Sequence, residues 1–157
     1  MKWCDLIAVI KGLLSFYEYP HAILIHCGGN DIGNSDSPCG LLTYEMKVSF
    51  AHIMYYLLPG CSIIFSSILP RLSYRFSSNI KKMDRTRKRI NRFVRTHLVK
   101  RYCYFIHHPD FDDMLPALFA EDGVHLSFIG NDIFINTLQG ALETFFTYPY
   151  IHVYPYN

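Results

Sequence analysis

Apolar residues recur along this chain with two different spacings, and these spacings alternate. Near-continuous apolar runs, typical of strands covered on both faces, occupy three segments: 22–27, 62–69 and 102–107. Helical spacing of apolar residues marks four segments: 3–17, 41–58, 80–98 and 128–146. Because helices and strands alternate, the pattern predicts a parallel sheet within a layered α/β fold.

The two ends of the last helical segment differ in character. Ser127 precedes this segment and is expected to cap its N-terminus, since a serine hydroxyl accepts a hydrogen bond from a free backbone N–H. After it, residues 147–157 are aromatic, contain two prolines and show no period. We therefore expect one domain over 1–146, followed by a loosely docked or disordered tail over 147–157.

Composition and charge describe a globular chain and little more. Half of the 157 residues are apolar and 18% are charged, which is enough to bury a core. A net charge of +2 does not by itself imply nucleic acid or acidic membranes as partners. The five cysteines are odd in number and widely spaced, so we expect reduced, buried thiols and an intracellular, cytoplasmic protein.

Neither a leader nor a membrane span is expected from the sequence. Residues 1–3 lead directly into an amphipathic segment, unlike a secretory signal. The longest apolar stretch, 51–69, is interrupted by Pro59 and Gly60, which fits the end of a helix and the start of a strand.

Two short polar motifs follow predicted strands. Gly28-Gly29-Asn30-Asp31 comes directly after the first strand, and Asp122-Gly123-Val124-His125 lies in the loop region after the third. In open α/β sheets, sites form beyond the carboxyl ends of the strands, so both motifs can reach the same rim.

Each motif alone is also explained as a turn, because glycine, asparagine and Asp-Gly pairs favour turns. The chemistry gives a sharper hypothesis. A carboxylate three residues before His125 can fix the histidine tautomer, and the Asn30 amide can donate a hydrogen bond to an oxyanion.

At this point the sequence resembles the SGNH hydrolase superfamily, also called GDSL-like lipases and esterases. Gly28, Asn30 and Asp31 match its third block, and Asp122 and His125 match its fifth. Further similarity lies in three segments, the last of which is especially like the SGNH domains of animal retrotransposon-type proteins: 68–71, 89–94 and 122–130.

The resemblance implies a three-layer α/β/α, flavodoxin-like fold with a parallel sheet. It implies that His125 is the general base and acid and that Asp122 orients it. Asn30 would be an oxyanion-hole donor, and Gly28 and Gly29 would allow close backbone approach there. The implied substrate is an acyl ester, of a small molecule or a lipid, and no metal or organic cofactor is implied.

The chain departs from the family in its nucleophile. No Gly-Asp-Ser occurs in the sequence, so we expect an N-terminally truncated SGNH domain without a serine block and without measurable esterase activity. Recruitment of another serine is not expected at the four positions considered: Ser35, Ser37, Ser66 and Ser67. The strand over 22–27 would then be an open edge, which predicts aggregation or a dimer through that edge.

Two other functions remain open alternatives. The basic segment 81–101 could contact nucleic acid, although a solvated outer helix face explains it more simply and nucleic acid is not the expected partner. The run His107-His108-Pro109-Asp110, with Asp112 and Asp113, offers metal-ligand types without helical zinc-site spacing. His26 is expected to be a hydrogen-bonded core histidine. A catalytically inactive interaction module on the same fold also fits the sequence.

Overall fold

Helices and strands alternate in the computed structural model, which describes residues 1–36 and 38–156. The main helices are α1 (Leu6–Leu14), α2 (Cys39–His52), α3 (Ile80–Val99) and α4 (Phe128–Thr147). The strands are β1 (Ala22–Ile25), β2 (Ser62–Ser66), β3 (Tyr104–Ile106) and β4 (Val153–Tyr154). Short helical turns complete the described elements: Trp3–Asp5, Ile53–Leu57, Pro109–Phe111 and Pro116–Leu118.

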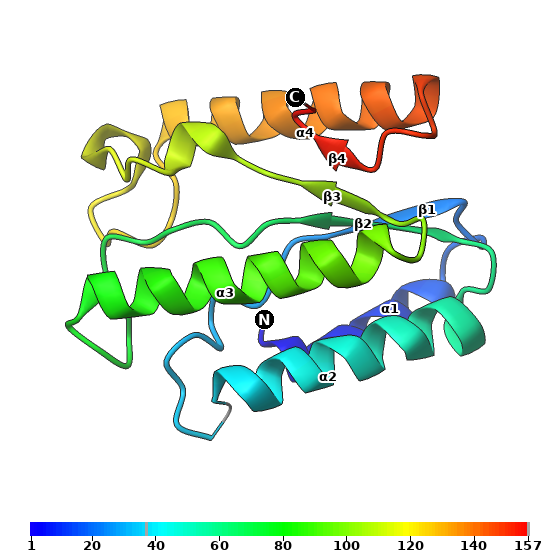
Figure 1. Ribbon diagram of the computed structural model, residues 1–157, viewed down its shortest axis with the longest axis horizontal. Helices are drawn as coiled ribbons and strands as arrows, with labels where there is room; N and C mark the ends of the chain where they lie inside the picture. Colours follow the sequence, from blue (N-terminus) through cyan, green and yellow to red (C-terminus); the bar gives the residue numbers. More distant parts are fainter. Residues whose placement is uncertain (37, 157) are drawn as a thin grey trace.

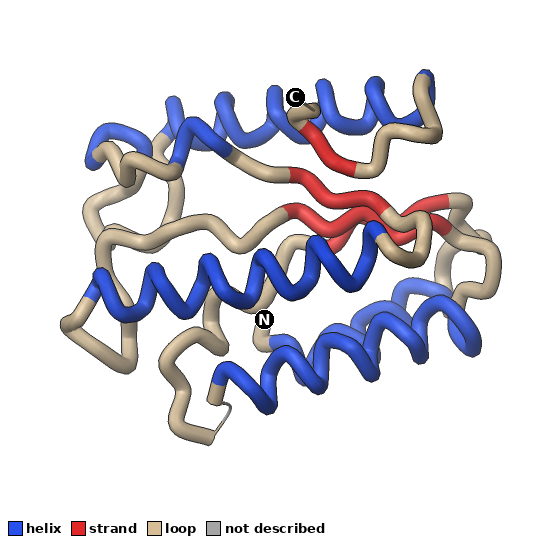
Figure 2. The backbone as a smooth tube through the Cα atoms, viewed as in Figure 1, coloured by secondary structure: helices blue, strands red, loops and turns tan. Residues whose placement is uncertain are grey.

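The strands form a parallel four-stranded sheet in the order β1-β2-β3-β4. Helices α1, α2 and α3 lie on one face of this sheet, and α4 covers the other (Figure 1). Figure 2 shows the strands as a central layer between the helices. The predicted three-layer α/β/α, flavodoxin-like arrangement is therefore confirmed.

Each face of the sheet has its own apolar core. On the side of α1, α2 and α3, large side chains such as Trp3, Phe50 and Phe65 are almost fully buried. On the side of α4, Ile64 and Ile106 of the sheet pack against Ala141 and Phe145 of the helix. Neighbouring residues of one strand thus face opposite cores, which explains why the strands read as continuous apolar runs.

The helix predicted over 41–58 does not continue as a regular α-helix. It is α-helical over Cys39–His52 and then widens into a π-helical turn over Ile53–Leu57. The Leu58 N–H donates to the Ile53 carbonyl five residues earlier, at 2.8 Å. Pro59 and Gly60 follow, as the sequence indicates.

The segment 147–157, which the sequence predicts to be a loose tail, contains a short strand. Val153 and Tyr154 form β4, which extends the sheet beyond β3. The Phe105 and His107 N–H groups donate to the carbonyls of His152 and Tyr154, at 2.9 and 2.7 Å. The tail is held because β3 presents unpaired backbone groups there, and Tyr154 packs against the α4 core. Asn157 lies outside the described residues.

Strand β1 lies at one edge of the sheet and pairs with β2 along one side, and its Leu24 is 37% exposed. In the part of the chain that the structure describes, no helix combines the length and apolar character that a membrane crossing requires.

Candidate active site

The second motif forms a hydrogen-bonded histidine–carboxylate pair. The Nδ1 atom of His125 lies 2.5 Å from an Asp122 carboxylate oxygen. The other Asp122 oxygen accepts from the backbone N–H groups of Val124 and His125, at 2.8 and 2.9 Å. The hydrogen bond from His125 and these two backbone bonds lower the pKa of Asp122 to about 2. The carboxylate therefore stays ionised and holds the imidazole with Nε2 away from it.

The turn that carries this pair is anchored to the loop after β2. The Gly123 carbonyl accepts from the N–H groups of Leu72 and Ser73, at 2.8 and 3.3 Å. Gly123 has φ +66°, and a Cβ there would lie 3.0 Å from the Leu72 Cβ. Both the left-handed backbone and the close approach favour glycine. The His125 side chain itself is 81% exposed.

The Asn30 amide of the first motif has a defined orientation. Its Oδ1 accepts from an Arg71 guanidinium nitrogen at 3.0 Å, and its Nδ2 donates to the Met1 carbonyl at 3.1 Å. Arginine can only donate hydrogen bonds, so the amide oxygen must face Arg71 and the NH₂ group must face the other way. The NH₂ group of Asn30 is therefore its donor, and its acceptor in this structure is the Met1 carbonyl.

The two glycines of this motif permit tight packing in different ways. Gly28 has φ +104°, and a Cβ there would lie 3.0 Å from atoms of both Ile68 and Met46. A Cβ on Gly29 would lie 2.7 Å from the Arg71 guanidinium. Gly29 therefore lets Arg71 reach Asn30, while Gly28 supplies the turn.

Asp31 of the first motif contacts the start of the chain, and the carboxylate paired with His125 is that of Asp122. It is 4% exposed, and its carboxylate accepts from the Trp3 N–H at 2.9 Å. Burial raises the pKa of Asp31, and the Trp3 hydrogen bond offsets part of that effect. This contact ties the turn after β1 to the start of the chain.

Helix α3 fixes the loop after β2 at its origin. The Asn91 side chain accepts from the Ile68 N–H at 3.0 Å and donates to the Ile68 carbonyl at 2.9 Å. Arg87 also donates to that carbonyl, at 3.0 Å, and pairs with Asp84 at 2.7 Å. These buried groups hold the chain just before Arg71.

The two motifs border one pocket of about 210 Å³. Its lining includes Gly28, Gly29 and Asn30 from the first motif and Val124 from the second. His26 also lines this pocket. The pocket therefore extends from Asn30 to the turn that carries His125.

Sequence reasoning missed a chain of hydrogen bonds behind this pocket. The Ser66 hydroxyl lies 2.9 Å from His26 Nδ1 and 2.7 Å from His108 Nε2. The Phe134 ring packs on both imidazoles, with ring centroids 4.9 and 4.8 Å away. His26 is hydrogen-bonded, as expected, but it is exposed and does not belong to the core. Only the pairing of β1, β2 and β3 brings these three side chains together.

The serines considered as nucleophiles do not pair with His125 in the described residues. Ser66 and Ser67 are 0% and 2% exposed, and Ser66 is bonded to the two histidines above. Ser35 is exposed and contacts Asp36, at 3.4 Å. Ser37 lies outside the described residues.

The metal-ligand candidates are distributed over different contacts. His107 Nε2 lies 3.0 Å from an Asp112 oxygen, whereas His108 is buried against Ser66. Within residues 1–36 and 38–156, no three His, Cys, Asp or Glu side chains are grouped so as to hold a metal ion.

Comparison with known proteins identifies the fold. No protein-family model and no curated protein matches the sequence. Solved structures with the same fold include a candidate acylhydrolase from Bacteroides fragilis, with a TM-score of 0.66 and 17% identity. That match covers 92% of this chain and 71% of the other. A protein from Streptococcus pneumoniae described as a candidate platelet activating factor has a TM-score of 0.61 and 21% identity, over 90% and 68% of the two chains. The chain therefore has the same fold as these two structures.

Proposed function

We propose that this chain carries an SGNH-type site for acyl esters of small molecules or lipids, and that it hydrolyses no ester by itself. In this proposal His125 is the general base and acid, Asp122 orients it and Asn30 donates to the oxyanion. The observation that carries the proposal is the His125–Asp122 hydrogen bond, on a turn anchored beside the pocket that Asn30 lines. The acylhydrolase-like fold supports it.

The geometry supports a definite use of each group. With Asp122 on Nδ1, the His125 Nε2 atom is the one available to take or return a proton. Asn30 donates through Nδ2, now to the Met1 carbonyl, and a carbonyl oxygen of an ester can accept the same hydrogen bond. Hydrolysis of the ester also requires a nucleophile that attacks its carbonyl carbon. Among the described residues no hydroxyl or thiol is hydrogen-bonded to His125, so we expect no acyl-enzyme.

Hydrolysis of p-nitrophenyl acetate tests both parts of the proposal. The chain and its His125→Ala variant are expected to show the same rate as buffer. A version extended before Met1 by a strand ending in Gly-Asp-Ser, designed to pair with the free edge of β1, is expected to hydrolyse the ester. Adding His125→Ala to that version is expected to abolish its activity.

Thermal melts of all versions establish that each is folded. Activity of the unextended chain that disappears in His125→Ala contradicts the proposed inactivity. An extended, folded version whose hydrolysis is insensitive to His125→Ala contradicts the proposed role of His125.

Self-association through β1 is part of this proposal. Among the described residues β1 pairs with β2 on one side only, and its Leu24 is 37% exposed on a face of the sheet beside that edge. We expect dimers or larger species in light scattering, and we expect Leu24→Lys to reduce them because a charge disfavours strand addition. A monomer at all concentrations contradicts this expectation.

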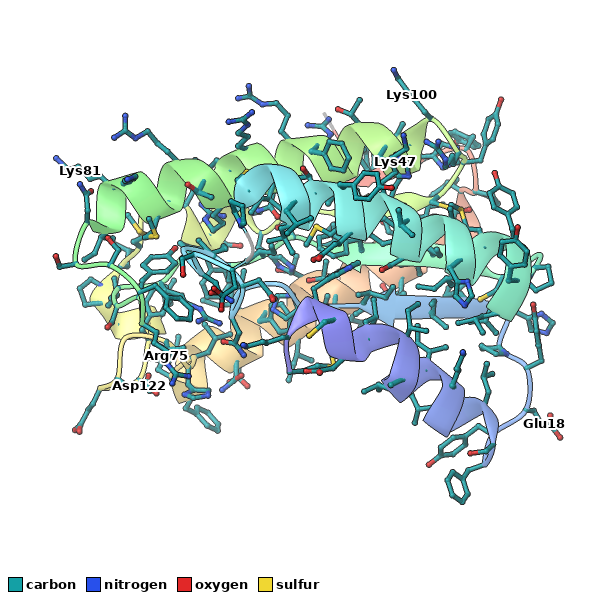
Figure 3. All side chains as sticks on the ribbon, turned by 90° about the horizontal axis from the view of Figure 1, so that it is seen from below. Glu18, Lys47, Arg75, Lys81, Lys100 and Asp122 are labelled. Atoms are coloured by element: carbon teal, nitrogen blue, oxygen red, sulfur yellow. The ribbon has the colours of Figure 1, made fainter. Side chains whose placement is uncertain are left out.

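A nucleic-acid interface on α3 is the second candidate. Figure 3 shows basic side chains projecting into solvent along α3, with Lys81 and Lys100 labelled near its two ends. Arg87 does not belong to this face, because it is buried and pairs with Asp84. A salt-dependent gel shift that is lost in the triple variant Lys81→Glu, Lys82→Glu, Arg85→Glu favours this function; no shift in low salt excludes it.

A further inference from the structure

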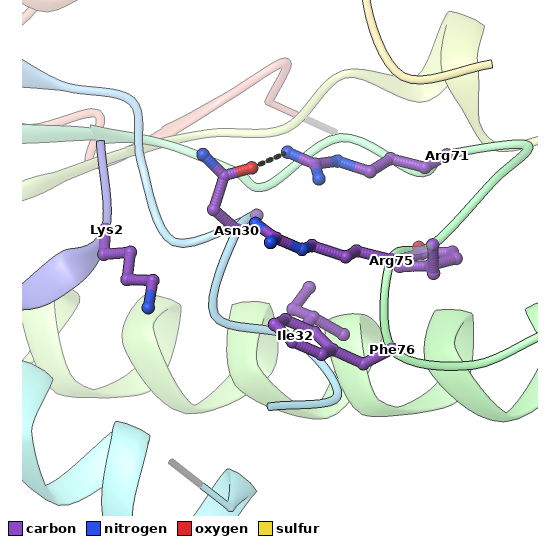
Figure 4. A pocket seen from close by; sticks show the side chains of 8 residues that line it. Lys2, Asn30, Ile32, Arg71, Arg75 and Phe76 are labelled. Carbon is purple, nitrogen blue, oxygen red and sulfur yellow. Dashed lines mark hydrogen bonds between the residues drawn. The ribbon is translucent and has the colours of Figure 1, made fainter. Parts of the chain in front are cut away.

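A second pocket lies on the other side of Asn30 and is lined by positive charges. Its volume is about 190 Å³. Lys2 comes from the start of the chain, whereas Arg71 and Arg75 come from the loop between β2 and α3. Figure 4 shows the two arginines running side by side toward Asn30, with Lys2 across from them. Three segments that are distant in sequence thus bring cationic side chains to one place.

None of these three cations forms an ion pair with a carboxylate of the described residues. The charges of Asp122 and Asp31 act on Arg71, but Asp31 accepts from the Trp3 N–H and Asp122 pairs with His125. Arg71 is half-buried and uses one guanidinium nitrogen for Asn30. A guanidinium has five N–H donors, so Arg71 has donors left for a ligand. A half-buried charge such as that of Arg71 is normally paired, which makes an anion the expected complement.

The rest of the pocket wall is apolar or aromatic. Ile32, Tyr74 and Phe76 line it together with the cations. Phe76 is 42% exposed, and the Arg75 guanidinium lies 5.8 Å from its ring centroid. This stacking holds Arg75 over the aromatic wall. A small anionic group attached to a carbon skeleton fits such a wall better than a free inorganic ion.

The two pockets are adjacent. Gly29, Asn30 and Arg71 line both of them. A molecule with its ester carbonyl beside Asn30 in one pocket can therefore place a charged group between Arg71 and Arg75 in the other. Three cations match a phosphate dianion better than a single carboxylate, and the planar guanidinium group suits phosphate oxygens.

We propose that Lys2, Arg71 and Arg75 form a binding site for the phosphate group of a phosphorylated acyl ester. The position of the ester rests on the proposed function, whereas the phosphate site does not. Binding is therefore measured without any hydrolysis, with glycerol 3-phosphate as the ligand and glycerol as the neutral control. We expect saturable binding of glycerol 3-phosphate, measured by the NMR shifts of the Gly29 and Asn30 backbone amides. We expect no binding of glycerol.

Variants separate this site from general charge attraction. Arg71→Gln is expected to weaken binding about tenfold or more, since it removes charge-assisted hydrogen bonds from a half-buried group. Arg75→Gln and Lys2→Gln remove more exposed charges and are expected to weaken it by up to about fivefold each. Arg92→Gln, an exposed arginine on α3, is the matched control and is expected to leave binding unchanged. His125→Ala is also expected to bind normally, which keeps this test independent of the proposed catalysis.

Vesicles identify the source of the phosphate. The lipid probe is phosphatidylcholine vesicles that contain phosphatidic acid. If these vesicles retain the chain but not its Arg75→Gln variant, the phosphate belongs to a lipid headgroup. Binding of glycerol 3-phosphate without vesicle retention indicates a soluble ester. The proposal is overturned if neither binds, or if Arg92→Gln weakens binding as much as Arg75→Gln does.

Discussion

Acidification is expected to remove folding stability through His108, because this histidine is buried in its neutral form. It is 2% exposed, and burial, followed by the charges of His26 and His107, lowers its pKa from 6.5 to about 3. Between these two values the unfolded chain binds a proton at His108 that the folded chain does not. Stability from this group is therefore complete above pH 6.5 and is lost as the pH falls toward 3.

The size of the effect follows from the shift. Each pH unit within this window costs about 1.4 kcal/mol, so the loss is about 2 kcal/mol at pH 5 and about 5 kcal/mol over the whole window. A domain is usually stable by only about 5–15 kcal/mol, so the transition should be visible in urea unfolding. A His108→Gln variant cannot titrate at this position and should lose less stability between pH 7 and pH 5 than the wild-type chain.

The assay is urea unfolding of both chains at pH 7, 6 and 5, together with the NMR titration of the His108 ring. The variant starts from a lower stability at pH 7, since it disturbs the contact with Ser66. Only the difference between the two pH slopes is attributed to His108. Equal slopes for both chains, or a ring that titrates near pH 6.5, would falsify the reasoning.

Two other predictions follow from single positions. Gly130→Ala should destabilise the fold by roughly 2 kcal/mol or more, because the new Cβ would overlap the Leu118 carbonyl oxygen at the start of α4. Gly12→Ala on α1 is its control: nothing lies within 4 Å of the new methyl group, and a gain of up to about 1 kcal/mol is expected in the same urea assay. In His125→Ala, the pKa of Asp122 should rise from about 2, since the hydrogen bond from His125 is the largest cause of its lowered pKa. A carboxyl NMR titration measures it, and an unchanged value would show that backbone bonds alone hold the carboxylate.

The interactions around Asn30 explain how the site would depend on distant residues. Arg71 orients the Asn30 amide, and α3 holds the chain before Arg71 through Asn91 and Arg87. Arg71, Asn91 and Arg87 all lie outside the two motifs. A substitution at Asn91 is therefore expected to act on the site without touching any ligand.

Much of the fold follows from the sequence because its causes are local. Apolar spacing places the helices and strands, and Pro59 and Gly60 end the helical segment before β2. Ser127 caps α4 as predicted, accepting from the Gly130 N–H at 3.1 Å. The Asp122–His125 pair spans three residues, so one turn brings it together. The strand order also places both motifs at the carboxyl ends of the strands.

The tertiary structure decided what depends on residues far apart in the chain. Arg71 meets Asn30 across 41 positions, and Ser66 joins His26 and His108 across 40 and 42. The tail becomes β4 because β3 offers unpaired backbone groups, and Lys2 joins the arginines only in the folded chain. Such polar contacts leave no period in the sequence, because each partner is chosen by the packing of whole elements and not by its neighbours along the chain.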